Sequence, residues 1–109
     1  MRIELDPRAE HMIREAIGDR PGLMRLVYDT ENCGCGMSGV PSLQIADEPG
    51  PYDMPMENDA FPFSIDRMQA VFFEERLMLT AEESGGTFRL DGVSQFYKSN
   101  LRLIDRRLP

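Results

Sequence analysis

The stretch LMRLVYDTENCGCGMSGVPSLQIAD, residues 23–47, contains two candidate strands and the segment that connects them. Residues 23–28 (LMRLVY) and 42–46 (SLQIA) are rich in residues that favour extended structure, and Leu43 and Ile45 share one face. The glycine-rich CGCGMSG segment between them is typical of a loop, because glycine relaxes the backbone. The pattern predicts two strands joined by this loop.

Both cysteines of the chain, Cys33 and Cys35, lie in this loop. Two thiolates one residue apart can contact the same metal ion, but zinc and the irons of iron–sulfur clusters prefer about four donors. A second subunit across a two-fold axis could supply the rest, as could the nearby carboxylates of Asp29 and Glu31. The spacing leaves two alternatives open for the cysteines: a tight structural turn, or a strained redox disulfide. For the carboxylates, the alternative is a role in solubility alone.

The composition indicates one soluble domain, residues 1–109, with 41% hydrophobic and 28% charged residues. No apolar run approaches the roughly 20 residues of a membrane span. The N-terminal sequence MRIELDPRAEH is charged from its second residue, so no secretory signal is visible. We therefore expect a cytoplasmic protein with reduced thiols and no membrane partner.

The charge is unevenly distributed along the chain. Between Leu26 and Asp66 there are eight acidic residues and no Lys or Arg, within a net charge of −7. A phosphate backbone needs cations to displace its counterions, so we expect no nucleic-acid partner. The acidic segment is consistent with a solvated surface, and alternatively with attraction of metal ions or a basic partner.

One amphipathic helix is predicted near the N-terminus, after a short strand over residues 2–5. Asp6 is a candidate N-cap and Pro7 suits the first helical position. Gly18 is a natural stop. The apolar stripe that this helix would bury comprises Ala9, Met12, Ile13, Ala16 and Ile17.

The remaining segments predict short strands and one short helix. Pro49, Pro51 and Pro55 favour a loop or an edge strand, and the alternation around Pro62 favours another edge strand. Asp66 is expected to cap a short helix in which Met68, Val71 and Phe72 share a face. Residues 77–81 and 87–90 flank a Ser-Gly-Gly turn and predict a hairpin, and a last strand is expected near residues 101–104. The expected fold is a β-rich α+β domain of about six or seven strands.

Hydrolase chemistry finds little support in the sequence. Ser38 lies in GMSG, which lacks the G-x-S-x-G spacing of a nucleophile elbow. His11, the single histidine, falls on the polar face of the predicted helix. We therefore predict no catalytic residues and no enzymatic activity.

The succession of these segments resembles the HesB-like (IscA-type) iron–sulfur cluster biosynthesis domain over nearly the whole chain. The most specific match is the run DTENCGCGMSGVP, residues 29–41, which is similar to the D-T-E-G-C-G-C-x-x-S-G-V-P signature of a short Firmicute branch. Asn32 stands where that signature has Gly, and Asn also tolerates positive φ. The C-terminal Cys-Gly-Cys of the full family motif is absent, since the chain ends NLRLIDRRLP.

The resemblance implies two packed small sheets with flanking helices, and a role in carrying iron or an Fe–S cluster to apoprotein clients, often as a homodimer. It makes Cys33 and Cys35 the cofactor-binding residues, with Asp29 and Glu31 as further candidate metal ligands. Fe–S assembly proteins are the other expected partners. The loop can be interpreted as two thiols gathered in compensation for the missing tail, or as a structural turn in a relative without a cluster.

The alternative hypothesis is a metal-free protein-interaction module on the same fold. Its binding surface would be the acidic middle segment and the Phe61-Pro62-Phe63 region.

Overall fold

The computed structural model describes residues 1–29, 40–83 and 86–107, which form two packed sheets. The four-stranded sheet has the order β1 (Arg2–Leu5), β6 (Arg76–Ala81), β7 (Phe88–Gly92), β8 (Phe96–Leu101). The five-stranded sheet has the order β4 (Asp53–Met56), β5 (Phe63–Asp66), β2 (Leu23–Asp29), β3 (Val40–Ala46), β9 (Leu103–Asp105). The expected β-rich α+β class is confirmed.

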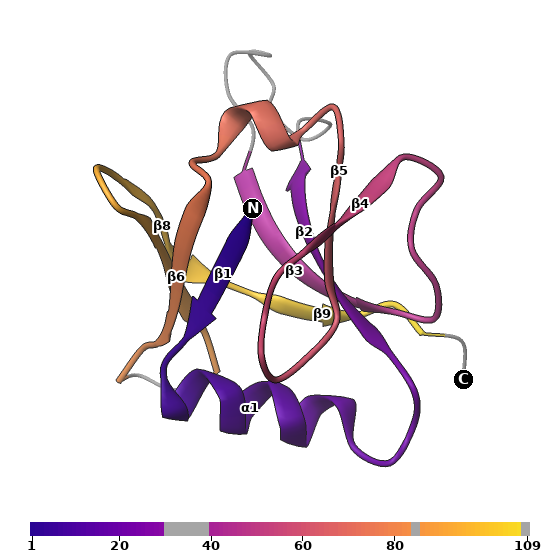
Figure 1. The fold of residues 1–109 in the computed structure, drawn as a ribbon. Helices are drawn as coiled ribbons and strands as arrows, with labels where there is room; N and C mark the ends of the chain where they lie inside the picture. Colours follow the sequence, from indigo (N-terminus) through magenta and orange to yellow (C-terminus); the bar gives the residue numbers. More distant parts are fainter. Residues whose placement is uncertain (30–39, 84–85, 108–109) are drawn as a thin grey trace.

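Helix α1 (Pro7–Ile17) lies across one end of the molecule, and the 3₁₀ helix η1 (Ala70–Phe72) lies at the opposite end (Figure 1). The predicted caps of α1 are confirmed: the Asp6 carboxylate accepts a 2.7 Å bond from the Ala9 N–H, and the chain leaves the helix at Gly18 with φ 64°. Within the described part of the chain, neither helix is long and apolar enough to cross a membrane.

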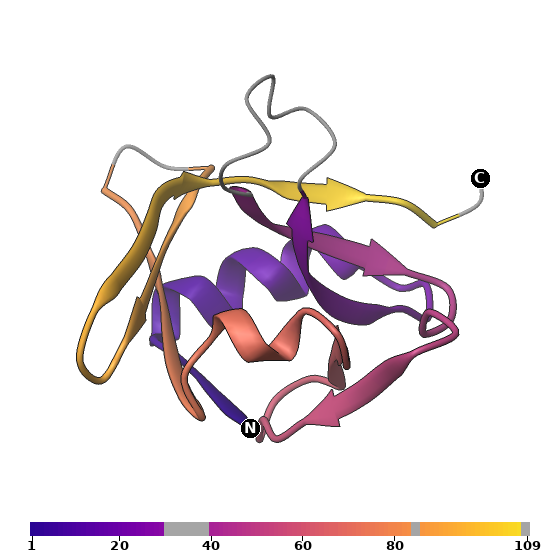
Figure 2. The same cartoon turned by 90° about the horizontal axis from the view of Figure 1, so that it is seen from above.

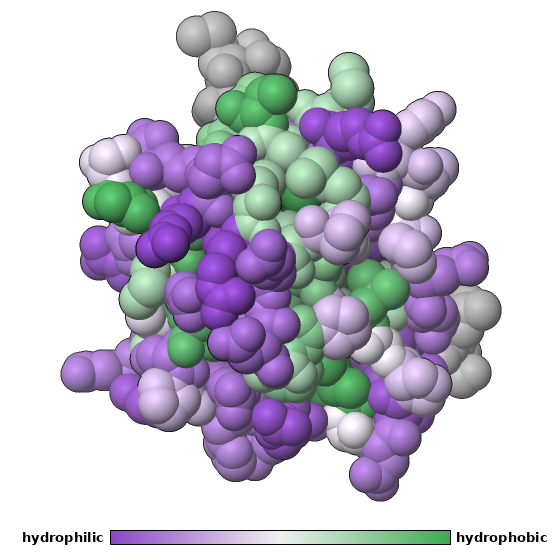
Figure 3. Space-filling view, viewed as in Figure 1, coloured by the Kyte–Doolittle hydropathy of each residue, from purple (hydrophilic) through white to green (hydrophobic). Residues whose placement is uncertain are grey.

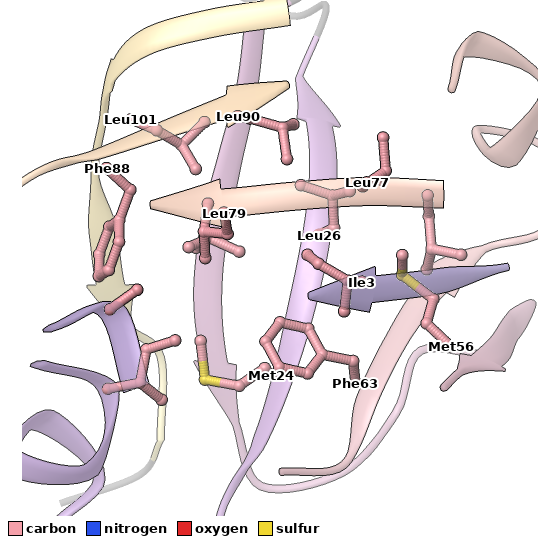
Figure 4. Packing of buried hydrophobic residues seen from close by; sticks show 14 of the residues in the cluster. Ile3, Met24, Leu26, Met56, Phe63, Leu77, Leu79, Phe88, Leu90 and Leu101 are labelled. Atoms are coloured by element: carbon pink, nitrogen blue, oxygen red, sulfur yellow. The ribbon is translucent and has the colours of Figure 1, made fainter. Parts of the chain in front are cut away.

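The hydrophobic core fills the space between the sheets and α1. Figure 4 shows Ile3, Leu77, Leu79 and Leu90 from the four-stranded sheet facing Met24, Leu26 and Phe63 of the five-stranded one. Burial of these side chains is the main favourable term in folding. Successive side chains of a strand point to opposite faces of the sheet, so the apolar–polar alternation of the sequence buries one face in this core.

The chain passes from one sheet to the other near its C-terminus (Figure 2). Leu101 ends β8 in the first sheet, and Leu103 begins β9, which pairs in parallel with β3 of the second. Asn100, just before this crossing, has φ 58°, a left-handed conformation that asparagine tolerates better than most residues. The expected single strand near residues 101–104 is therefore two strands, and it extends further in both directions.

The prediction of an edge strand around Pro62 was wrong, because β5 lies between β4 and β2. Pro62 itself precedes the strand, so it removes no hydrogen-bond donor from the ladder. Phe63, Ser64 and Ile65 are all buried, as expected for an internal strand covered on both faces. The edge position belongs to β4, whose Pro55 fits the other expectation.

A buried ion pair ties three strands of this sheet together. The Arg25 guanidinium on β2 donates two bonds, of 2.7 and 2.8 Å, to the Asp53 carboxylate at the start of β4. The Ser64 hydroxyl on β5 donates a third, of 2.8 Å, to the same carboxylate. The Asp53 side chain is only 1% exposed. These bonds to the ionised form hold the pKa of Asp53 at about 2, below its ordinary 3.8, with the bond from Arg25 as the largest cause.

We predict that Asp53→Asn lowers the free energy of unfolding at pH 7 by about 3 kcal/mol, since it leaves Arg25 without its charge partner. Because the pKa of Asp53 is depressed in the folded state, its stabilising effect is present above pH 4 and is lost as the pH falls toward 2. The difference in the free energy of unfolding between Asp53→Asn and the wild type should therefore become smaller as the pH falls from 4 toward 2. Urea unfolding at several pH values measures this difference.

The matched control is Asp59→Asn, since Asp59 also contacts an arginine, Arg2, but has an 88% exposed side chain. It should change the unfolding free energy by less than about 0.5 kcal/mol. Equal effects of the two substitutions would contradict the structural importance of the buried pair.

Candidate functional site

The candidate site lies where β2 ends and β3 begins. These strands are antiparallel, and Asp29 pairs directly with Val40, so the two ends of the connecting segment leave the sheet side by side. We call this place the Asp29–Val40 end. The predicted ligands Cys33, Cys35 and Glu31 lie outside the described residues, as does the side chain of Asp29. Both cysteines nevertheless belong to the one short connection between these paired residues.

The 3₁₀ helix η1 is fastened to this end of the sheet through Tyr28. The Gln69 side chain accepts a 2.9 Å bond from the Tyr28 N–H and donates a 3.0 Å bond to the Tyr28 carbonyl. The Gln69 side chain thus pairs with both backbone groups of Tyr28, as the backbone of a neighbouring strand would. The Phe72 ring stacks on the Tyr28 ring, with centroids 4.5 Å apart and planes 14° from parallel. This arrangement holds η1 one residue from Asp29.

An aromatic cluster continues from Tyr28 to the other sheet. Phe73 contacts Tyr28 edge-on at 5.8 Å and Tyr97 of β8 at 5.2 Å between ring centroids. The Tyr97 hydroxyl accepts a 2.9 Å bond from the Glu74 N–H. The surroundings that the structure builds near the Asp29–Val40 end are thus aromatic, and they span both sheets.

The C-terminal tail is held far from this end. Strand β9 runs parallel to β3, so residues after Asp105 lie beyond the end of the sheet opposite to Asp29 and Val40. There the Arg107 guanidinium donates to the Ile17 and Ala16 carbonyls of α1, at 2.7 and 3.1 Å, and to the Asp105 carboxylate at 2.8 Å. The side-chain bond from Arg107 to Asp105 is the largest cause that lowers the pKa of Asp105 to about 2, and the Arg107 N–H bond to the same carboxylate also lowers it. Residues 106 and 107 are therefore directed away from the Asp29–Val40 end.

The surface expected for an interaction module is smaller than the sequence suggested. Phe63 is 3% exposed and belongs to the core, and Phe61 is half-buried beneath the Arg14 guanidinium, 5.2 Å from its ring centroid. Of the predicted trio only Pro62 is exposed. Asp53, counted with the acidic surface, is instead buried in its ion pair. Alternation of aromatic residues could not distinguish a buried internal strand from an exposed edge.

No cluster of metal-binding side chains is found among the described residues. They contain no group of three or more His, Cys, Asp and Glu side chains that could hold a metal ion. His11 is exposed on α1, as expected, and contacts Glu15 at 2.9 Å.

The iron–sulphur cluster biosynthesis family matches residues 1–105. YqkB of Bacillus subtilis (strain 168), an uncharacterized protein, is 28% identical over 105 residues, which cover 95% of this chain and 98% of YqkB.

Two solved structures are similar in fold. A Lactobacillus salivarius protein assigned to Fe–S biosynthesis superposes with a TM-score of 0.82 at 12% identity, covering 99% of this chain and 100% of the other. An IscA structure with a [2Fe-2S] cluster gives a TM-score of 0.62 at 20% identity, covering 95% and 98%. The chain belongs to the iron–sulphur cluster biosynthesis family, the HesB/IscA type that its sequence resembles.

Sequence reasoning missed the link between Gln69 and Tyr28. The two residues are 41 positions apart, and a glutamine between apolar residues has no local signature. The one available signal was the predicted short helix after Asp66, whose carboxylate does accept the Met68 N–H at 2.8 Å.

We predict that Gln69→Ala loosens η1 from the Asp29–Val40 end. Two hydrogen bonds to a partly buried backbone are lost, so the free energy of unfolding should fall by about 1–2 kcal/mol. Hydrogen exchange of the Tyr28 amide should accelerate about tenfold, which mass spectrometry of the peptide over β2 can measure.

The control is Gln95→Ala, because the exposed Gln95 amide donates to the Tyr97 hydroxyl at 3.1 Å and lies outside the Gln69–Tyr28 link. It should leave exchange of the Tyr28 amide unchanged. Unaltered exchange in Gln69→Ala would show that η1 is held by its rings alone.

Proposed function

We propose that this protein carries iron or an iron–sulfur cluster as cargo, bound through the thiolates of Cys33 and Cys35, and delivers it to apoproteins. The observation that carries the proposal is the pairing of Asp29 with Val40, which closes the cysteine-containing segment at its base in a chain of the iron–sulphur cluster biosynthesis family. The role involves no catalytic turnover by the chain's own residues.

The donor chemistry supports this cargo. Thiolates are the usual protein ligands of iron–sulfur clusters, and they bind the metal only when deprotonated. The related IscA structure contains a [2Fe-2S] cluster. A chain with two cysteines supplies half of the four donors that such a cluster takes. The remaining donors would come from a second copy or a client, with Asp29 and Glu31 as weaker candidates.

The position of residues 103–107 fits ligation through the connection. Strand β9 and Arg107 hold these residues beside α1, whereas the connection leaves the opposite end of the sheet. The proposal therefore assigns the ligands to the connection and none to residues 103–107.

We predict that the wild-type protein, reconstituted anaerobically with iron and sulfide, binds both and shows thiolate-to-iron absorption in the visible range. Cys33→Ser/Cys35→Ser should lose this absorption and at least about tenfold in bound iron, because a hydroxyl stays protonated and is a poor iron ligand. Iron and sulfide per monomer are measured beside the spectrum.

Two comparisons sharpen this experiment. Asp29→Asn and Glu31→Gln should keep the thiolate-to-iron bands, since carboxylates do not produce them. Ser38→Ala controls for any change in the same segment. A double cysteine variant that binds iron as wild type does would refute the proposal. A wild-type protein that remains free of iron and sulfide would instead favour the metal-free interaction module.

A further inference from the structure

A groove follows the segment from Pro55 to Phe63, beside strand β1. Its volume is about 510 Å³, and it is lined mainly by apolar residues, among them Met56, Phe61 and Pro62. Figure 3, seen from the side on which β1 and β4 lie, shows apolar side chains in the middle of this face with hydrophilic ones beside them. We call this hollow the 55–63 groove.

Hydrogen bonds to β1 hold the wall of the groove in place. The Glu57 N–H donates to the Met1 carbonyl at 2.9 Å, and the Glu57 carbonyl accepts the Ile3 N–H at 3.0 Å. The Asn58 side chain donates to the Ile3 carbonyl at 2.8 Å and accepts the Phe61 N–H at 3.0 Å. Because the wall is already ordered, little conformational entropy would be lost when a ligand binds.

The rim of the groove is acidic. The side chains of Glu57 and Asp59 are 79% and 88% exposed, and Arg2 contacts them at 3.7 and 2.8 Å. Glu4 also contacts Arg2, at 2.6 Å. Three carboxylates around one guanidinium leave a net charge of −2 here, in a chain whose net charge is −7. This potential attracts a cationic ligand.

Two arginines of the chain show how this surface contacts a guanidinium. Arg14 lies over the Phe61 ring, and Arg2 donates to the Asp59 carboxylate at 2.8 Å. Aromatic ring faces and carboxylates are the partners that arginine prefers. An ionised carboxylate has about four acceptor positions, so the exposed Glu57 and Asp59 can accept bonds from further cations.

The exposed apolar side chains over η1 form a different kind of surface. Met68, Val71 and Phe72 are exposed there. The exposed charges next to them, Arg67 and Glu75, are of opposite sign. Charge therefore selects no class of partner at η1, whereas it does so at the groove.

We propose that the 55–63 groove binds a basic segment of a partner protein in which apolar side chains lie next to arginine or lysine. Glu57 and Asp59 bind the cations, while Met56 and Phe61 contact the apolar side chains and the aliphatic stems of the basic ones. A metal ion would leave the apolar part of the groove without a contact. A nucleic acid would be repelled by the acidic rim.

The first test is an NMR titration of the ¹⁵N-labelled, metal-free protein with a capped hexapeptide of alternating arginine and leucine. We expect saturable amide shifts at Arg2 and residues 57–61, with a dissociation constant below about 1 mM. A peptide of alternating arginine and glycine should bind at least about threefold more weakly, because it has no apolar side chains to bury. A peptide of alternating glutamate and leucine should cause no shifts there. A wild-type protein without saturable shifts at these residues would overturn the proposal.

Glu57→Gln/Asp59→Asn should raise the dissociation constant of the arginine–leucine peptide at least about fivefold, because it removes two carboxylates from the rim. The matched control is Asp47→Asn/Glu48→Gln, two exposed carboxylates outside the groove. It makes the same change in net charge and should alter the dissociation constant less than about twofold. Equal weakening by both double variants would refute the groove as the binding site. All four positions are exposed, so circular dichroism should show an unchanged fold.

The outcome is separable from that of the proposed function. Phe63 in the groove pairs with Met24 near the start of β2, whereas the cysteine-containing connection follows Asp29 at the end of this strand. Cys33→Ser/Cys35→Ser should therefore bind the arginine–leucine peptide as the wild type does. Loss of iron binding with intact peptide binding would remove the cargo role and keep the groove. Iron and sulfide bound to a protein that ignores the peptide would do the reverse.

Discussion

Strand β2 is hydrogen-bonded on both sides, antiparallel to β3 and parallel to β5, and most of the structure depends on this double pairing. Its Met24 and Leu26 enter the core, and its Arg25 holds Asp53 of β4 in place. Near its end, Tyr28 is hydrogen-bonded to Gln69, which precedes η1. The strand ends at Asp29, which pairs with Val40. One strand therefore connects the stability of the fold to the position of the cysteine-containing connection.

The two ends of the molecule differ in their chemistry. At the α1 end, Arg107 donates hydrogen bonds to carbonyls of the last turn of the helix, where backbone acceptors have no partner within the helix, and this anchors residues 105–107. At the Asp29–Val40 end, the structure presents rings and an apolar face. The connection that contains both cysteines begins and ends there. Under the proposed function, a carrier has to bind its cargo and also contact a partner, and an apolar surface beside the connection would serve the second need.

Local chemistry explains which elements could be predicted. The caps of α1 at Asp6 and Gly18, and the hairpin of β6 and β7, follow from residues close together in the sequence. The edge assignment of residues around Pro62 failed because burial on a second face comes from distant segments. The expected exposure of Phe63 was wrong for the same reason, since alternation specifies a side of the strand and not what covers it.

The sequence by itself determined the family, the β-rich class, the helix with its caps and the placement of both thiols in one connection between two strands. Only the tertiary structure decided that β5 is internal, that Asp53 is buried against Arg25, that the tail runs toward α1, and that η1 lies beside Asp29. Caps, turns and side-chain periods act over a few residues, so they can be read from the chain directly. Parallel pairings such as β2 with β5, and contacts such as Gln69 with Tyr28, join segments tens of residues apart, where no local preference selects one partner over another.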